Sequence, residues 1–134
     1  RDGPVTLRAS RDYQPAYDLD LAGEDTALLA SPPYINTGVT FLQGDLLAAI
    51  DLARPLRVAA ERYNHFAEQT ILALAARRLA APTWAPSVVA CFQDDHQSLA
   101  VTYRDRSWVA RHYVGPVRHL FWRDALALRV GVTP

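Results

Sequence analysis

The 134-residue sequence has no methionine, no lysine and a single cysteine, and these absences narrow the classes of protein it represents. With Cys91 as the only cysteine, an intrachain disulfide and a zinc site built from several cysteines are both excluded. No apolar run approaches the roughly 20 residues that span a bilayer, so we expect no membrane span. No signal-peptide pattern opens the chain, and the cytoplasm is therefore the simplest compartment.

The chain also lacks an excess of charge of either sign. It has 14 basic and 14 acidic residues, a formal net charge of zero, and no basic block, so we expect no nucleic-acid partner. All the basic residues are arginines, whose planar guanidinium can donate two hydrogen bonds to a phosphate. The bias towards arginine and alanine indicates a GC-rich, bacterial coding genome.

Length and composition predict a single folded domain over residues 1–134. Because the chain starts at Arg1 and contains no methionine, we expect it to be a piece of a longer protein. Apolar patterning predicts strands at 5–9, 34–44, 87–92 and 108–114, and helices at 46–53, 56–63, 65–80 and 119–130. Asp45 and Asn64 are candidate helix caps, and residues 36–38 predict a bend or bulge within the second strand. The alternation predicts an α/β fold, a mixed sheet with flanking helices, rather than a complete doubly wound sheet.

The stretch RHYVGPVRHLFW, residues 111–122, follows an apolar strand and combines groups that bind metals and phosphates. A neutral His112 can ligate a divalent metal. Gly115 lets the backbone approach a ligand closely, and Arg118 can reach a phosphate with two hydrogen bonds. The plain alternative is a strand histidine with satisfied hydrogen bonds and a surface arginine near the start of a helix.

This spacing resembles the His-x-x-Gly-x-x-Lys-Pro-Trp motif of retaining glycosyltransferases with the GT-A fold, the family-eight group that includes glycogenin and lipopolysaccharide galactosyltransferases. The resemblance implies that His112 binds a manganese or magnesium ion, with an acid supplied from elsewhere. It also implies that Gly115 and Arg118 contact the diphosphate of a nucleotide-sugar donor such as a UDP-sugar. Arg118 stands where the family has lysine, and Trp122 lies two positions further on than the family's tryptophan.

Two further segments resemble the same family, and they occur in the family's order. INTGV (35–39) is similar to the Asn-(Ser/Ala)-Gly-Val element, which implies that Asn36 faces the donor sugar and the acceptor. FAEQTILAL (66–74) is similar to the Asp-Gln element at a helix start, which implies catalytic or sugar-facing roles for Glu68 and Gln69. Read without the family, Asn36 is a polar residue in a bulge and Glu68 complements a helix dipole.

The resemblance implies transfer of a sugar from a nucleotide-diphosphate donor to a glycan or other acceptor, with a divalent metal. It covers the acceptor-side, C-terminal half of a GT-A fold, and no nucleotide-binding half precedes it here. A half-sheet exposes an edge and an apolar face, so we expect self-association or pairing with that missing half. A non-catalytic transferase-like module that binds a glycan or a protein partner is the alternative function.

Other polar groups carry weaker interpretations. Asp18 and Asp20 have the letters of an Asp-x-Asp metal motif but are more simply an exposed polar turn. Asp94, Asp95 and His96 are expected to be solvated loop residues, although a metal-dependent hydrolase would need such a cluster. His65 and Glu68 share a helix face at i and i+3; they are expected to serve helix capping, and the alternative is a pair of metal ligands. The tryptophans are expected to pack in the core or at sheet edges, and one of them could stack on a sugar: Trp84, Trp108 and Trp122.

Overall fold

The computed structural model describes residues 4–62, 64–92, 109–113, 118, 121–122 and 125–126. The chain divides into two compact units, Arg1–Ala85 and Pro86–Pro134, and each unit is described by itself. Both helices and strands are present, so the fold is mixed α/β. Within the described residues, no helix has the length and apolar character needed to cross a membrane. The expectation of one domain over the whole chain stays a prediction.

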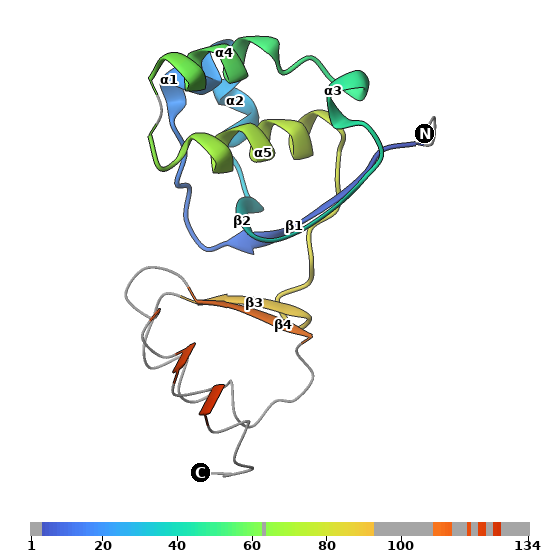
Figure 1. The fold of residues 1–134 in the computed structure, drawn as a ribbon, viewed down its shortest axis with the longest axis vertical. Helices are drawn as coiled ribbons and strands as arrows, with labels where there is room; N and C mark the ends of the chain where they lie inside the picture. Colours follow the sequence, from blue (N-terminus) through green and yellow to red (C-terminus); the bar gives the residue numbers. More distant parts are fainter. Residues whose placement is uncertain are drawn as a thin grey trace. The chain divides into compact units, whose positions relative to one another are not determined.

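The first unit places several helices against a two-stranded antiparallel sheet. Strand β1 (Thr6–Asp12) pairs with strand β2 (Tyr34–Gln43). The helical elements are α1 (Leu19–Ala22), η1 (Gly23–Asp25), α2 (Thr26–Leu29), α3 (Leu46–Ala49), α4 (Ala53–Glu61) and α5 (Ala67–Arg78). Figure 1 shows these helices gathered on one side of the β1–β2 ribbon.

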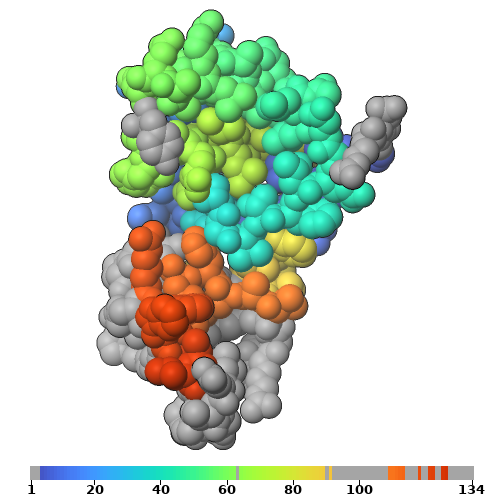
Figure 2. Space-filling model, in the orientation of Figure 1, coloured from blue at the N-terminus to red at the C-terminus, as the bar shows by residue number. Residues whose placement is uncertain are grey.

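Helix α5 is the centre of the first unit. The predicted helix over 65–80 is confirmed in its main part, and Asn64 caps the turn before it through a hydrogen bond from the Phe66 amide to Oδ1 (2.8 Å). Its buried face is rich in alanine, and Leu74 is 1% exposed among core side chains from β1, α1 and β2. Small side chains allow the helix to lie close to the sheet. Figure 2 shows α5, in yellow-green, between α4 and the region of β2.

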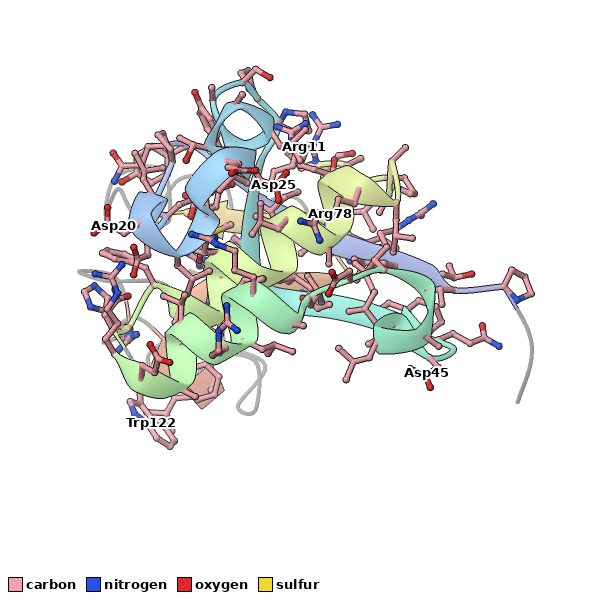
Figure 3. All side chains as sticks on the ribbon, turned by 90° about the horizontal axis from the view of Figure 1, so that it is seen from above. Arg11, Asp20, Asp25, Asp45, Arg78 and Trp122 are labelled. Atoms are coloured by element: carbon pink, nitrogen blue, oxygen red, sulfur yellow. The ribbon has the colours of Figure 1, made fainter. Side chains whose placement is uncertain are left out.

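Two arginines at the C-terminal end of α5 hydrogen-bond to three other segments of the first unit. The Arg77 guanidinium donates to the carbonyl of Pro33 (3.0 Å). The Arg78 guanidinium donates to the carbonyl of Asp51 and to the carboxylate of Asp25. Figure 3 shows Arg78 beside Asp25. Arginine at this end of a helix also complements the negative end of the helix dipole, as the sequence predicts.

Several element boundaries differ from those expected from the sequence. The predicted strand over 5–9 continues to Asp12, and residues 19–29, for which the sequence predicts no element, contain the three short helical elements α1, η1 and α2. The predicted helix over 46–53 ends at Ala49, after one turn capped by the Asp45 carboxylate. Helix α4 begins at Ala53, three residues before the predicted start at 56. Pro55 still lies in the first turn, where its missing N–H leaves no hydrogen bond unmade.

The edge of β1 that does not pair with β2 is partly covered by the segment that follows α5. Thr83 forms an isolated parallel bridge with Ala9, and the Trp84 amide donates to the Ala9 carbonyl (2.9 Å). The Arg8 guanidinium lies 4.8 Å from the centre of the Trp84 ring. Trp84 therefore packs at a sheet edge, as one of the sequence interpretations expects.

The second unit contains a separate two-stranded sheet. Strand β3 (Val89–Phe92) pairs in parallel with strand β4 (Ala110–Tyr113). The described strands thus form two small sheets, one antiparallel and one parallel, rather than the expected single mixed sheet. Of the predicted helix over 119–130, residues 121–122 and 125–126 are described and helical. Its other residues lie outside the described ranges.

Candidate functional site

The first unit contains a buried polar cluster formed by Asp12 from β1, Asn36 from β2 and Gln69 from α5. The Asn36 amide nitrogen donates to Asp12 Oδ2 (3.0 Å) and to Gln69 Oε1 (3.4 Å). The Gln69 amide nitrogen donates to the same Asp12 oxygen (3.4 Å). All three residues are at most 9% exposed. A carboxylate that accepts from two amides makes the stronger, charge-assisted kind of hydrogen bond.

A bulge in the β1–β2 pairing positions Asn36. The strand register jumps from Ala9 opposite Thr40 to Ser10 opposite Asn36, which confirms the predicted irregularity. The Ser10 hydroxyl donates to the Asn36 carbonyl (3.1 Å) and accepts from the Val39 amide (3.2 Å). Asn36 Oδ1 accepts from the Gly38 amide (2.7 Å). These bonds fix both the backbone and the side chain of Asn36.

The cluster has its remaining polar atoms paired within the unit. The Gln69 amide nitrogen also donates to the Ala16 carbonyl (3.1 Å). Asp12 Oδ1 accepts from the Tyr13 amide (2.8 Å). Buried polar groups that are fully paired hold one geometry, because any rearrangement would leave a donor or acceptor without a partner. The cluster is therefore a rigid support for the residues beside it.

Exposed Glu68 and half-buried Thr37 form the outer margin of this cluster. Each is the sequence neighbour of a cluster residue, and the Thr37 hydroxyl donates to Glu68 Oε1 (3.2 Å). Glu68 is exposed, while Gln69 next to it is buried. The structure thus brings together the three residues that the INTGV and FAEQTILAL segments single out, namely Asn36, Glu68 and Gln69. Only the Glu68 carboxylate among them is open to a ligand from solvent.

A tyrosine supports the cluster from the loop after β1. The Ile35 amide donates to the Tyr17 hydroxyl (2.6 Å), at the position before Asn36 in β2. Burial raises the pKa of the Tyr17 phenol above its ordinary value of 10.0, against the opposing effects of the Ile35 hydrogen bond and of Arg77. Tyr17 therefore stays a neutral hydrogen-bonding group through the physiological pH range.

The aspartates with the letters of a metal motif have structural roles instead. Asp18 Oδ1 caps α1 by accepting from the Leu21 amide (3.0 Å), and its Oδ2 accepts from the Asn64 side chain (2.5 Å). Asp20 forms an exposed ion pair with Arg62 (3.3 Å). Asp18 belongs to a helix start rather than to the expected polar turn. Both of its carboxylate oxygens are engaged within the protein.

His65 lies exposed at the turn before α5, with its ring centre 3.7 Å from that of Phe66. The cap of this turn is the Asn64 side chain, which accepts from the Phe66 amide. The expected capping role of the His65 and Glu68 pair is therefore filled by Asn64. Glu68 interacts with Thr37 on β2 instead.

In the second unit, His112 lies on β4 directly opposite Cys91 on β3. His112 Nδ1 is 3.9 Å from Cys91 Sγ, and both residues are half-buried. Arg118 is exposed. Gly115, the third residue of this motif, lies outside the described residues, as do Asp94, Asp95 and His96. The structure therefore describes two of the three residues predicted for metal and diphosphate binding.

The described residues around His112 do not by themselves complete a manganese or magnesium site, and the metal role of His112 stays a prediction. These ions prefer oxygen ligands, whereas the donor that faces His112 is a thiol. Within the described ranges, no three His, Cys, Asp or Glu side chains are grouped so that they could hold a metal ion. The metal implied by the resemblance therefore enters none of the chemistry derived below.

Asp12 is the site residue that sequence reasoning missed. It follows Ser10 and Arg11, and this polar run hides the continuation of the strand. Its partner Gln69 lies 57 positions along the chain, so no local spacing connects the two.

The comparisons of this chain with protein-family models, with curated proteins and with solved structures found no match.

Proposed function

We propose that this chain is the acceptor-side part of a glycosyltransferase that uses a nucleotide-sugar donor, with Glu68 facing the sugar. One observation carries the proposal: Asn36 and Gln69, from two motifs that resemble the same family, hydrogen-bond to each other across the β2–α5 junction. Residues 33 positions apart have no local reason to meet in this way. The likeness to the C-terminal half of a GT-A fold belongs to this proposal.

In this function the cluster residues have separate tasks. Asp12, Asn36 and Gln69 are buried and paired, so they act as positioning residues that fix the bulge and the start of α5. Glu68 is exposed and accepts hydrogen bonds from sugar hydroxyls. Its negative charge also stabilises the positive charge that develops at an anomeric carbon as the glycosidic bond breaks. The Thr37 hydroxyl is a second hydrogen-bonding group beside the Glu68 carboxylate.

Arg118 takes the diphosphate of the donor in the proposed function. Its guanidinium is exposed and suits bidentate contact with phosphate oxygens. Gly115 would allow close approach of the backbone in the same segment. Neutralisation of the diphosphate makes it a better leaving group, which is the contribution expected of Arg118 to glycosyl transfer.

The sugar-facing role of Glu68 can be tested by saturation-transfer NMR with UDP-glucose. The wild-type chain should transfer saturation to the glucose protons, and Glu68→Gln should weaken sugar binding about tenfold through loss of a charge-assisted hydrogen bond. Glu61→Gln, at the exposed end of α4, is the matched control and should bind as wild type does. Equal binding by Glu68→Gln and Glu61→Gln would contradict the role.

The diphosphate role has its own test, by calorimetric titration of UDP with and without Mn²⁺. Arg118→Gln should weaken UDP binding, whereas Arg57→Gln on the exposed face of α4 should leave it unchanged. A folded wild-type chain that binds neither UDP nor UDP-glucose would contradict the proposal for this chain.

A non-catalytic, glycan-binding module is the second candidate function. It is favoured by the use of Asp18 as a helix cap and by the lack of a three-ligand metal group among the described residues. The two functions differ in an assay for UDP release from UDP-glucose with sugar acceptors. Glycan binding without UDP release would favour the binding module over the transferase.

A further inference from the structure

The sheet of the first unit has one outer edge that is partly covered and one that no described strand covers. Along β1, Thr83 bridges to Ala9 and the Trp84 amide donates to the Ala9 carbonyl (2.9 Å). Among the strands that the structure describes, β2 pairs with β1 alone. Every second residue of an antiparallel strand turns its N–H and C=O to the same edge. The outer edge of β2 therefore presents a row of main-chain groups that another strand can pair with.

The sequence of β2 lacks the features that usually prevent pairing at such an edge. Natural edge strands are protected by charged side chains, by proline, by a bulge or by a covering segment. Residues 34–44, YINTGVTFLQG, contain no charged residue and no proline, whereas β1 carries Arg8, Arg11 and Asp12. The bulge of β2 is confined to residues 37–39, so the later part of the strand stays regular and unprotected.

The later part of β2 also exposes apolar side chains on both faces of the sheet. Phe41 and Leu42 are each 47% exposed, and as neighbours on a strand they point to opposite faces. A strand added at this edge places its own side chains beside both of them, which removes apolar surface from water. A two-stranded sheet is also only marginally stable alone and gains from further strands.

The absence of charge favours a second copy of this chain as the occupant of the edge. Identical strands that pair about a two-fold axis bring the same few side chains together from both copies, so a charged strand would repel itself. Residues 34–44 carry no charge that could act in this way. The whole chain has a formal net charge of zero, so long-range repulsion between two copies is also small.

The limits of the strand select the register of such a pairing. Partners in an antiparallel pair must turn their main-chain groups to the same edge, so identical strands pair only in registers that shift by two residues. With the two Phe41 residues opposite each other, Thr40 faces Leu42 and the paired stretch is Val39–Gln43, all within β2. The register centred on Leu42 would instead use Gly44, which lies beyond the strand at a positive φ of 93°.

We infer that two copies of this chain form a two-fold dimer by antiparallel pairing of their β2 strands, with the two Phe41 side chains opposite each other. The two sheets then join in the order β1–β2–β2–β1. Assembly stops at two copies, because both outer edges now belong to β1, which the segment at Thr83 partly covers. The inference does not depend on the proposed function, and it concerns the first unit alone.

The first test is sedimentation equilibrium of the tag-free 134-residue chain from about 1 μM to about 1 mM, a range that covers weak association. A reductant is present, so no disulfide through Cys91 contributes. The mean mass should rise from one chain towards two. Phe41→Lys sets two like charges opposite each other at the axis and should weaken the dimer at least about tenfold. Leu47→Lys, on exposed α3, is the matched control and should dimerise as wild type does.

Two results of this experiment would overturn the inference. A wild-type chain that stays monomeric throughout the range would leave the edge of β2 to a strand from a different protein or segment. A folded Phe41→Lys that dimerises as wild type does would place the interface elsewhere.

The second test examines the register by disulfide cross-linking. Directly opposed residues of an antiparallel pair have Cα atoms about 4.5–5.5 Å apart, which lies within the range that a disulfide spans. Phe41→Cys should therefore give a covalent dimer on mild oxidation with diamide. Leu47→Cys is the control, and Cys91 is present in both variants and in wild type. Equal cross-linking by Phe41→Cys and Leu47→Cys would overturn the proposed pairing.

Circular dichroism shows whether each variant is folded. If Phe41→Lys fails to fold, the mass of the wild-type chain and the contrast between Phe41→Cys and Leu47→Cys still decide the matter. Loss of sugar binding in Glu68→Gln would not affect the inference, because a monomer and a dimer carry the same Glu68 on α5.

Discussion

In the first unit Asn36 and Gln69 are 5% and 8% exposed, and their side-chain amides both donate to the Asp12 carboxylate. In the second unit Cys91 and His112 are half-buried on a two-stranded sheet. Among the described residues, almost all the buried hydrophobic side chains belong to the first unit. The first unit thus holds its polar groups in a packed core, whereas Cys91 and His112 of the second unit are register partners on a two-stranded parallel sheet.

This contrast separates two ways of building a site. Buried and paired amides have one geometry, which suits a support that holds an exposed neighbour such as Glu68 in place. The polar groups described in the second unit are half-buried and lie on two neighbouring strands. Substitutions should therefore affect the stability of the first unit more strongly than that of the second.

The largest effect is expected from Leu74→Ala on α5. Leu74 is 1% exposed, and removing its side chain from the core should cost about 2–5 kcal/mol in free energy of unfolding. Leu47→Ala, at 63% exposure on α3, should change it by less than about 0.5 kcal/mol. Urea denaturation followed by circular dichroism measures both.

The same variant tests whether the two units are independent. Native-state alkylation of Cys91 reports the second unit, and Leu74→Ala should leave its rate unchanged if the units unfold separately. A matching rise in Cys91 reactivity would show that destabilising the core of the first unit also opens β3 and β4, so that the two units unfold together.

A smaller effect is expected from Asp12→Ala. The Asn36 and Gln69 amides would lose their shared acceptor, at a cost of about 1–3 kcal/mol in unfolding free energy. Asp20→Ala, which removes an exposed ion pair with Arg62, should have little effect. A thermal melt of Asp12→Ala that matches wild type would mean that the cluster is not the rigid support described here.

The smallest effect is a pH dependence that comes from Tyr17. Its pKa is raised in the folded state, so the folded protein holds this proton more tightly than the unfolded chain. Stability from this source is intact below pH 10.0 and is lost as the pH rises above that value towards the folded pKa. Tyr17→Phe should lessen the alkaline loss of stability seen in urea melts.

Tyr13→Phe is the control for this measurement, because Tyr13 is 56% exposed. It should retain the alkaline loss of wild type. If Tyr17→Phe and Tyr13→Phe lose stability equally above pH 10.0, the burial of Tyr17 has no consequence for folding. Tyr17→Phe should also lower stability at neutral pH by about 1 kcal/mol, since the Ile35 amide loses its acceptor.

The parts of the fold predicted from sequence are those with strong local patterns. Helix α5 has regular apolar spacing, Asn64 before it and arginines at its end, and the bulge in β2 shows in the Asn-Thr-Gly sequence. Asp45 is likewise found as a helix cap. In each case the residues that decide the structure lie within one or two turns of each other.

The parts that were missed depend on distant contacts. Helices α1 and α2 have four residues each, which is too short for periodicity to show or for a helix to form alone. They are held from elsewhere: the Arg54 guanidinium donates to the Leu21 carbonyl (3.0 Å), and the Asp18 amide donates to the Thr70 hydroxyl (2.8 Å). Asp12 was not predicted as a site residue for the same reason: the amides that donate to it, those of Asn36 and Gln69, come from other elements.

The two arginines at the end of α5 have a consequence for how the first unit moves. Arg77 and Arg78 are adjacent, yet they hold three different segments, at Asp25, Pro33 and Asp51. Three connections that would otherwise fluctuate separately share one anchor. Opening of any one of them loosens the anchor for the others, so the three behave as a single cooperative unit in local unfolding.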